Sequence, residues 1–287
     1  MSYKSPTEDF KYNLAMLNYD EVIAGIEKFK EYDSETLMSV VSEIGRLNEQ
    51  EVLDSNKIGD REGLKYVTDG VEGPEVHTPE RFKKLYEAVK ASGYVGATMP
   101  TQYGGGGAPF TTAILAGEIG IAANMAFYMG PGLSHGAMKT ILKKATDELK
   151  DKYLPNLTSG EWMGTMCLTE PQCGTDLGLI KSTAIPKDDH YELTGQKIWI
   201  SFGEHDLTEN IIHLVLARTP DAPEGIKGIS LFLVPKRLDD NSRNTIYCGG
   251  LEHKLGIASS PTCVMNLDNA KGWLVGEKNK GMEAMFL

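Results

Sequence analysis

The chain has 287 residues, of which 41% are hydrophobic and 24% are charged, a composition typical of a soluble globular protein. This length allows two domains, since domains usually hold about 100–200 residues. The formal net charge of −11 argues against non-specific binding to nucleic acid or to an anionic membrane, because such binding needs a basic face.

The cysteines and histidines do not form a recognisable metal-binding pattern. The four cysteines have no C-x-x-C spacing, and the six histidines have no H-E-x-x-H arrangement. Structural zinc needs clustered ligands of these types, so we expect no metal site. No uninterrupted apolar run follows the first residues, so we expect no signal peptide. The protein is therefore expected to be cytoplasmic, with its cysteines as reduced thiols.

Helical patterns run from the start of the chain to about residue 160. Ser5-Pro-Thr-Glu8 is typical of a capping box at a helix start. Apolar residues recur every three or four positions from Ser34 to about Asn56, which predicts a long helix. The glycine-rich and charged segment from Gly59 to Thr78 is predicted to be a loop. Thr78-Pro-Glu80 predicts another capped start, for a helix that stops at Gly93.

The most apolar segment runs from Ala113 to Met129 and contains a glutamate and an asparagine, so it predicts a buried helix rather than a membrane span. Further helices are predicted over His135–Lys144 and over Thr146–Leu154, the second closed by Pro155 and Ser159-Gly160. The glycine run Tyr103-Gly-Gly-Gly-Gly107 is not followed by Gly-Lys-Ser/Thr, which argues against a nucleotide phosphate loop.

The pattern changes between Glu161 and about Trp273, where short apolar or alternating runs are separated by turn residues. Several short strands at close spacing predict a β-barrel or a β-sandwich. The run Ile211–Ala217 does not alternate, so we expect it to be buried on both faces. The predicted strands are Met163–Leu168, Ser182–Pro186, Tyr191–Thr194, Lys197–Ser201, Ile211–Arg218, Ile229–Pro235 and Pro261–Leu267.

The expected fold class is therefore α+β with more than one domain. We expect an all-α N-terminal domain over residues 1–160 and a barrel or sandwich as a middle domain over residues 161–275. The sequence turns helical again after Gly276 and stops at Leu287 without a cap or a polar tail. Because a helix end with unpartnered carbonyls is a poor terminus, residues 276–287 are expected to begin a truncated helical domain.

Two stretches in the β region carry the candidate site. The first, from Met166 to Asp176, leaves a strand at Thr-Glu-Pro, because proline biases the residue before it away from helix. The turn that follows offers backbone N–H groups, a hydroxyl and Gly174, which are parts of an anion-binding concavity. In the second stretch, side chains two apart share a face of a strand, so Trp199 and Ser201 are expected side by side.

Each of these pieces, taken singly, also fits a structural role. Thr-Glu-Pro is a common strand exit, and a tryptophan in a strand is commonly part of the core. Glu170 fits a hydrogen-bonded structural carboxylate better than a catalytic base, since a base must reach the proton that it removes.

Taken together and in this order, the stretches resemble the acyl-CoA dehydrogenase family, whose middle domain carries a C-[LMV]-T-E-P-x-x-G-[ST]-D segment and a K-x-W-I-[ST] segment. Segments Lys254–Thr262 and Met99–Gly105 extend this resemblance over most of the chain from about Arg81. The start Tyr3-Lys-Ser-Pro6, followed by a short helix, resembles the long branch of the family that includes the 3-methylmercaptopropionyl-CoA dehydrogenases.

The resemblance implies FAD-dependent α,β-dehydrogenation of an acyl-CoA thioester, with the hydride passing to N5 of the flavin. Thr175 is implied as a substrate contact as well as a cofactor contact. In the family the base is a glutamate of the C-terminal helical domain, so no residue of this chain is implied as the base, and the chain alone is expected to be inactive. The implied cofactor contacts are Met166, Leu168, Thr169, Gly174, Thr175, Trp199, Ile200 and Ser201.

Two departures from the family pattern concern the flavin edge. An aromatic residue is frequent where this chain has Met166, and small residues usually stand where Gln172 and Cys173 lie. The resemblance also implies an electron-transfer flavoprotein as acceptor, a homodimer or homotetramer, a role in fatty acid metabolism, and no nucleic-acid or membrane partner.

Three other functions stay open. The same fold serves acyl-CoA oxidases and nitroalkane-oxidase-like flavoproteins, which react faster with oxygen when reduced. It also serves DNA-binding flavoproteins, which a salt-dependent gel shift would reveal. The simplest alternative is a helical domain joined to a barrel without a cofactor, which FAD absorbance would distinguish.

Overall fold

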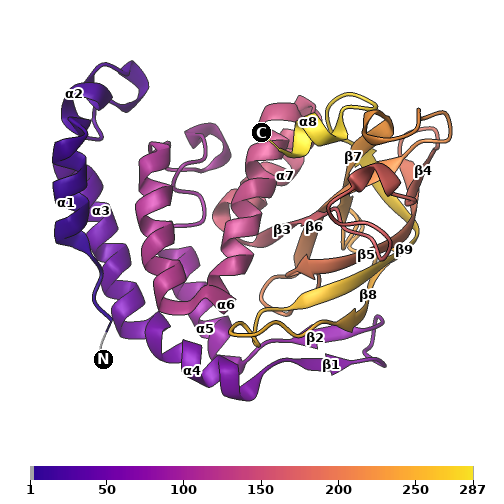
Figure 1. Cartoon of the computed structure of the whole chain (residues 1–287), viewed down its shortest axis with the longest axis horizontal. Helices are drawn as coiled ribbons and strands as arrows, with labels where there is room; N and C mark the ends of the chain where they lie inside the picture. Colours follow the sequence, from indigo (N-terminus) through magenta and orange to yellow (C-terminus); the bar gives the residue numbers. More distant parts are fainter. Residues whose placement is uncertain (1–2, 287) are drawn as a thin grey trace.

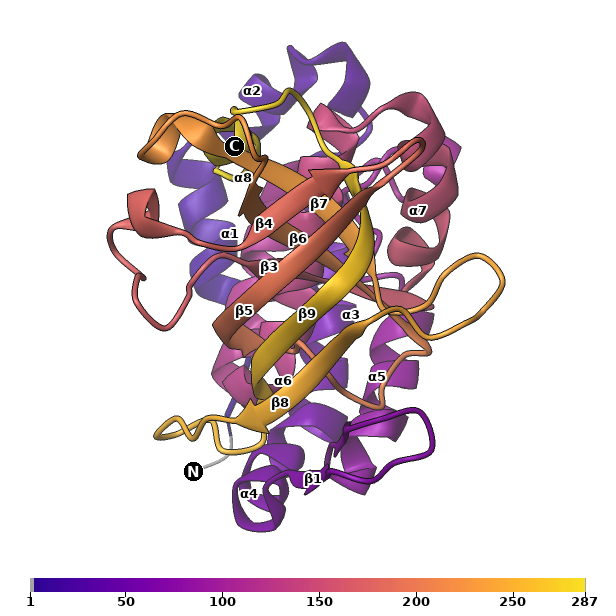
Figure 2. The same ribbon diagram turned by 90° about the vertical axis from the view of Figure 1, so that its right-hand side faces the viewer.

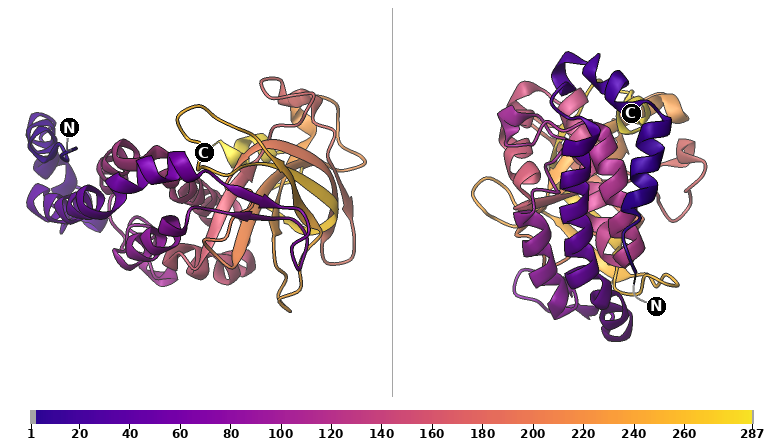
Figure 3. Two further views of the ribbon diagram at one scale, coloured as in Figure 1. Left: turned by 90° about the horizontal axis from the view of Figure 1, so that it is seen from below. Right: turned by 90° about the vertical axis from the view of Figure 1, so that its left-hand side faces the viewer.

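The computed structural model describes residues 3–286, with helices at one end of the molecule and a β-barrel at the other (Figure 1). The outermost helices are α1 (Thr7–Met16), α2 (Tyr19–Ala24) and α3 (Ser34–Leu47), which lie farthest from the barrel. The view from below in Figure 3 shows the same separation along the long axis.

The predicted helix from Ser34 to about Asn56 is present and extends further. Asp33 caps its start, because its carboxylate accepts a hydrogen bond from the Thr36 amide at 2.8 Å. After α3, the chain passes through the π-helical turn η2 (Asn48–Val52) directly into α4 (Leu53–Glu62). The outer helices thus form one continuous wall against the central helix α6.

Two predicted helix caps are wrong. The Ser5 amide donates to Glu49 Oε1 at 2.8 Å, and α1 begins after Pro6 without a side-chain cap. The Thr78 hydroxyl donates to Asp206 at 2.8 Å, and α5 (Glu80–Ala91) likewise has no side-chain cap. The Ser5 amide and the Thr78 hydroxyl thus have tertiary partners in place of the local bonds that the sequence pattern favours, while the Ser5 hydroxyl is buried without a partner among residues 3–286.

The predicted loop over Gly59–Thr78 contains a β-hairpin, so the N-terminal part is not entirely helical. Its strands β1 (Lys65–Val67) and β2 (Glu75–His77) pair antiparallel. The Tyr66 hydroxyl donates to the carbonyl of Cys248 in the barrel at 2.9 Å, so the hairpin packs against the barrel. Strands of three residues are too short to show a clear alternating pattern.

The central helix is α6 (Phe110–Lys144), which joins two segments that were predicted as separate helices. The break lies at Asn124, whose φ of −155° and ψ of 92° are not helical. Its Oδ1 accepts from the Phe127 amide at 3.1 Å and its Nδ2 donates to Ser55 at 2.7 Å, so it caps the second half. By length and hydropathy α6 could cross a membrane, but buried residues such as Ile119 make it a core helix, as predicted.

Helix α7 (Asp147–Ser159) begins where the sequence predicted, with the Thr146 hydroxyl as its cap. Its predicted end at Leu154 is wrong, because Pro155 lies inside the helix. The second stop signal, Ser159-Gly160, is confirmed, since the helix ends at Ser159 and Gly160 has a φ of +83°.

The predicted barrel is confirmed as a closed ring in the order β6-β4-β5-β9-β7, which returns to β6. Strand β3 adds to β6 in parallel, and β8, which was not predicted, pairs antiparallel with β9. Figure 2 shows β4, β5, β9 and β8 side by side. The strands are β3 (Trp162–Cys167), β4 (Thr183–Pro186), β5 (Tyr191–Ser201), β6 (Asn210–Arg218), β7 (Ile229–Pro235), β8 (Ile246–Leu251) and β9 (Thr262–Leu274).

Among residues 3–286 the buried apolar side chains form three clusters: one joins the helices to the barrel, a second lies mainly within the barrel, and a third lies mainly among the outer helices. The cluster of buried residues that contains Ile44 of α3 continues through α6 into the barrel and reaches Met285. Close packing of α6 on β3 depends on Gly164, where a Cβ would lie 2.5 Å from that of Ala137. Strand β6 is buried along nearly its whole length, as its sequence predicted. The last described helix, α8 (Gly281–Met285), returns to pack on β7.

Candidate functional site

A buried ion pair joins the two stretches that the sequence singled out. The Lys197 ammonium lies 2.8 Å from Glu170 Oε1, and the two side chains are 0% and 3% exposed. Lys197 also donates to the carbonyl of Leu168 at 3.0 Å, and the Ile198 amide donates to the carbonyl of Thr169 at 2.9 Å. The start of the turn after β3 is therefore fixed against β5.

Glu170 uses its carboxylate to shape this turn. It accepts hydrogen bonds from the backbone amides of Lys181 (2.7 Å) and Ser182 (3.1 Å) and from the Gln172 side chain (2.6 Å). Burial raises the pKa of Glu170, but the Lys197 charge and these bonds outweigh burial and lower the pKa to about 2. Glu170 is thus a structural carboxylate, as the sequence favoured, and not a base.

Trp199 lies at a β-bulge and not in a regular strand. The pairing of β5 with β9 shifts register between Lys197 and Ile200, and Trp199 has a φ of +62°. A bulky residue rarely adopts this conformation, because its Cβ crowds the backbone. The ring is 44% exposed, with the Lys254 ammonium 5.9 Å from its centre. The Trp199 ring is therefore exposed to solvent, although its backbone conformation is energetically unfavourable.

The bulge changes what period-2 alternation predicted for β5. Ser201 is only 9% exposed, whereas Trp199 is 44% exposed, so the two do not share one regular strand face. The carbonyl of Ser201 accepts a hydrogen bond from Thr165 of β3 at 2.9 Å. Ile200 is 2% exposed within the barrel core, and its carbonyl already accepts from the Gly203 amide at 3.2 Å. In this structure Ile200 is therefore closed to a ligand, in contrast to the contact that was predicted there.

The turn after Cys173 presents unpaired donors. Gly174, Thr175 and Asp176 are exposed, and among residues 3–286 their amides donate to no protein acceptor. A Cβ at Gly174 would lie 3.4 Å from the Thr169 side chain, so turn and strand exit are in contact. A row of free amides is a common binding arrangement for an anion such as phosphate.

Two hydroxyls and two apolar side chains complete the predicted set. Within the described range, the Thr169 and Ser201 hydroxyls have no protein hydrogen-bond partner, so both can bind a ligand. Met166 and Leu168 are half-buried at the edge of the core that includes α6. A Cβ at Gly136 of α6 would lie 3.2 Å from the Met166 sulfur. The structure thus brings the stretches that carry the predicted contacts together at the exit of β3, with Ile200 buried among them.

The sequence did not single out Arg218, which lies at the end of β6 beside this turn. A cavity of about 480 Å³ opens there, lined by Arg218, Asp176, Gly178 and the loop after β6. The only sequence signal is an arginine as the last residue of the predicted strand Ile211–Arg218, which is otherwise apolar except for His213.

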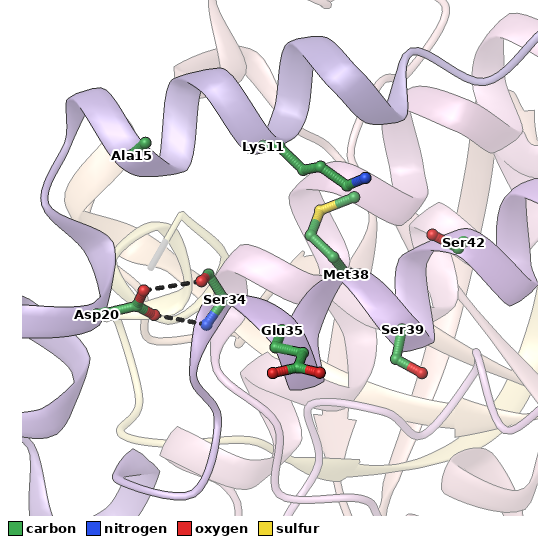
Figure 4. A pocket seen from close by; sticks show the side chains of 8 residues that line it. All are labelled: Lys11, Ala15, Asp20, Ser34, Glu35, Met38, Ser39 and Ser42. Carbon is green, nitrogen blue, oxygen red and sulfur yellow. Dashed lines mark hydrogen bonds between the residues drawn. The ribbon is translucent and has the colours of Figure 1, made fainter.

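A second cavity, of about 460 Å³, lies between α1, α2 and α3 (Figure 4). Its Asp20 carboxylate accepts from the Ser34 amide at 2.6 Å and from the Ser34 hydroxyl at 2.8 Å, so these groups are already paired. This cavity is at the far end of the molecule from the barrel. Within residues 3–286 no three His, Cys, Asp or Glu side chains are placed to hold a metal ion.

These features define a helical domain joined to a barrel, with an exposed aromatic ring, two unpaired hydroxyls and three unpaired amides near the exit of β3 among residues 3–286. The model of the acyl-CoA dehydrogenase N-terminal domain matches residues 66–161, and that of the middle domain of the same family matches residues 165–270. The chain belongs to the acyl-CoA dehydrogenase family. The resemblance seen in the sequence is therefore confirmed.

The chain spans about half the length of the curated relatives that it matches. The 3-methylmercaptopropionyl-CoA dehydrogenase of Ruegeria pomeroyi is 41% identical, over 100% of this chain and 49% of that protein. The broad-specificity linear acyl-CoA dehydrogenase FadE5 of Mycobacterium tuberculosis is 34% identical, over 99% of this chain and 48% of that protein. A solved acyl-CoA dehydrogenase of Bacillus anthracis, complexed with FAD, has a TM-score of 0.72 and 26% identity, covering 89% of this chain and 40% of that one.

Proposed function

We propose that this chain forms the N-terminal and middle parts of an FAD-dependent acyl-CoA dehydrogenase. The observation that supports this most directly is the Trp199 ring, which is held exposed at a φ of +62° beside free hydroxyls and free amides. Residues held in such a strained backbone conformation cluster at ligand-binding sites, so the strain at Trp199 supports a ligand there. The membership in the family gives this ligand its chemical class.

The residues present fit a flavin dinucleotide. The amides of Gly174, Thr175 and Asp176 suit phosphate oxygens, while the hydroxyls of Thr169 and Ser201 suit the polar edge of the ring system. When bound, the flavin supplies the electron-accepting ring for α,β-dehydrogenation. The Trp199 ring packs beside it and excludes water, and Glu170 with Lys197 keeps the hydroxyls and amides in place.

The substrate we propose is an acyl-CoA thioester, with Thr175 also in contact with it. No residue of this chain is proposed as the base, because the one glutamate at the site, Glu170, is buried in an ion pair and fully bonded. An electron-transfer flavoprotein as acceptor, a homodimer or homotetramer and a cytoplasmic location belong to the same proposal. A slow reaction of the reduced protein with oxygen would support a dehydrogenase over an oxidase.

Titration of the purified chain with FAD tests the proposal. We expect weak but saturable binding with quenched or red-shifted flavin absorbance. Trp199→Ala should raise the Kd about 2- to 12-fold, the effect of losing about 0.5–1.5 kcal/mol of aromatic packing. Thr175→Ala should also weaken binding, because it removes a hydroxyl from the free turn.

Trp273→Ala is the matched control. Trp273 is another partly exposed barrel tryptophan, but it lies beside Lys152 of α7, with the ammonium 4.9 Å from its ring. Its loss should leave the FAD affinity unchanged. Equal effects of the two tryptophan substitutions, or no saturable FAD binding by the unsubstituted chain, would contradict the proposed site.

A further inference from the structure

Among the residues that the structure describes, the Arg218 side chain donates hydrogen bonds to backbone carbonyls only. Its Nε donates to Ile180 at 2.9 Å, its Nη1 to Pro223 at 2.9 Å, and its Nη2 to Gly178 at 2.7 Å and to Gly225 at 2.6 Å. The first and third of these carbonyls belong to the loop after Asp176, and the other two belong to the loop after β6. One guanidinium therefore joins two loops.

This use of an arginine differs from its other uses in the barrel. Arg237 and Arg243 form salt bridges with Glu72 and Glu204, whereas among residues 3–286 no carboxylate forms one with Arg218. A guanidinium keeps its charge and presents donors in a rigid planar fork, so it can satisfy several carbonyls at once. A lysine ammonium has no such fork.

The loops are packed tightly around this group. A Cβ at Gly228 would lie 1.8 Å from the Pro223 carbonyl oxygen and 2.6 Å from Arg218 Nη1, so the backbone at Gly228 packs directly against this carbonyl and the guanidinium. The Arg218 amide itself donates to the carbonyl of Ser182 at 2.9 Å, which fixes the backbone of Arg218 to the barrel. The Arg218 side chain therefore fixes both loops relative to β6.

The turn with the free amides is held from both sides. At its start, Glu170 and Cys173 exchange backbone hydrogen bonds of 2.9 and 3.0 Å. At its end, Asp176 Oδ1 accepts from the Gly178 amide at 3.0 Å, and the Gly178 carbonyl accepts from Arg218. Gly174, Thr175 and Asp176 lie between these two fixed points.

We propose that Arg218 is a positioning residue for ligand binding: by clamping the Gly178–Ile180 loop to the Pro223–Gly225 loop, it sets the free amides of residues 174–176 in the geometry that receives the ligand's phosphate groups. This inference rests on the proposed function, because FAD is the ligand in question. Arg218 touches no reacting group and acts through the turn. It also shapes the cavity of about 480 Å³ beside that turn.

Arg218→Lys tests the clamp, because lysine keeps the charge but reaches fewer of the carbonyls. We expect its Kd for FAD to rise about fivefold or more, since binding sites depend on the residues that hold their donors in place. Hydrogen exchange should accelerate at the amides of residues 174–180 and 222–228 and stay unchanged in α6. A purely structural role would instead speed exchange throughout the molecule.

Arg237→Lys is the matched control. Arg237 also donates to a loop carbonyl, that of Asn241 at 3.1 Å, and pairs with Glu72, but it lies away from the turn. We expect its substitution to leave the Kd for FAD within about twofold of the unsubstituted chain. An equal rise of the Kd in the two variants would overturn the inference.

The outcomes also separate this inference from the proposed function. Failure of the unsubstituted chain to bind FAD would overturn both. Normal FAD binding that Arg218→Lys leaves unchanged would overturn the inference alone. If Arg218→Lys does not fold, Gly178→Ala takes its place, because its Cβ would lie 2.9 Å from Asp176 Oδ1 and disturb the same loop. Unchanged FAD affinity in that variant would likewise overturn the inference.

Discussion

Single buried charges determine how the two site stretches meet. Lys197 and Glu170 are almost completely removed from water, which is costly for each of them unless the other is present. Glu170 then uses its remaining acceptor capacity on two backbone amides and one side-chain amide. The pair therefore holds the turn after β3 against β5, and the positions of the exposed groups of the site depend on it.

The losses of stability from removing the two partners of this pair should not be additive. Glu170→Gln should lower the free energy of unfolding by about 3–5 kcal/mol, because it leaves the Lys197 charge buried without a counter-ion. The double variant Glu170→Gln with Lys197→Met should lose less than the sum of the two single variants, as measured by urea unfolding. Glu8→Gln, which breaks the exposed pair with Lys11, is the control and should change stability by less than about 0.5 kcal/mol. Additive single losses would contradict the ion pair.

The same carboxylate should make stability depend on acid pH. The pKa of Glu170 is lowered from 4.5 to about 2 in the fold, so the folded state binds its proton less readily than the unfolded chain does. Its stabilisation is therefore complete above the unfolded pKa and is lost as the pH falls from 4.5 toward 2. The stability difference between the unsubstituted chain and Glu170→Gln should shrink over this range. A constant difference would show that the charge of Glu170 is not what stabilises.

Strand β5 shows, at the scale of one element, what the sequence could and could not predict. Its two halves, Tyr191–Thr194 and Lys197–Ser201, were predicted as strands, and the structure joins them into one. Alternation predicts a shared face only in a regular strand, and the bulge at Trp199 follows from pairing with β9, a contact between distant segments. The strands of the hairpin β1–β2 were missed because three residues carry little pattern, and β8 was missed because Gly249 and Gly250 interrupt its apolar run. Long helices and buried strands were found because their patterns repeat.

Helix α6 sets the position of the turn that follows Trp199. A Cβ at Gly130 would lie 2.8 Å from the ring of Phe202, which is 1% exposed and has a φ of +54°. Gly130→Ala should therefore destabilise the fold by about 1–3 kcal/mol through overpacking and should weaken FAD binding by displacing this turn. Gly132→Ala, two positions further on, meets nothing within 4 Å and should instead stabilise by up to about 1 kcal/mol. Urea unfolding of the two variants distinguishes them, and equal shifts would contradict the packing.

In the whole molecule, apolar packing and polar contacts join the helices to the barrel, in addition to the covalent connection along the backbone. The hydrophobic core extends without interruption from Ile44 to Met285. Polar contacts at the periphery add to it. Asp206, in the loop after β5, accepts from the Thr78 amide at 3.0 Å and from its hydroxyl at 2.8 Å, and its carboxylate lies 3.0 Å from the Lys83 ammonium of α5. Neither part can therefore unfold without exposing apolar surface of the other.

This shared core predicts one cooperative unfolding transition. The tryptophans, at positions 162, 199 and 273, all belong to the barrel region, so their fluorescence reports on the barrel, while far-UV circular dichroism at the helical band reports mainly on residues 7–159. Thermal unfolding followed by both signals should give midpoints that agree within about 2 °C, because coincident probes are the mark of a cooperative transition. Asp206→Ala should lower both midpoints together. A barrel signal that melts separately from the helical signal would show that the core between them contributes little to stability.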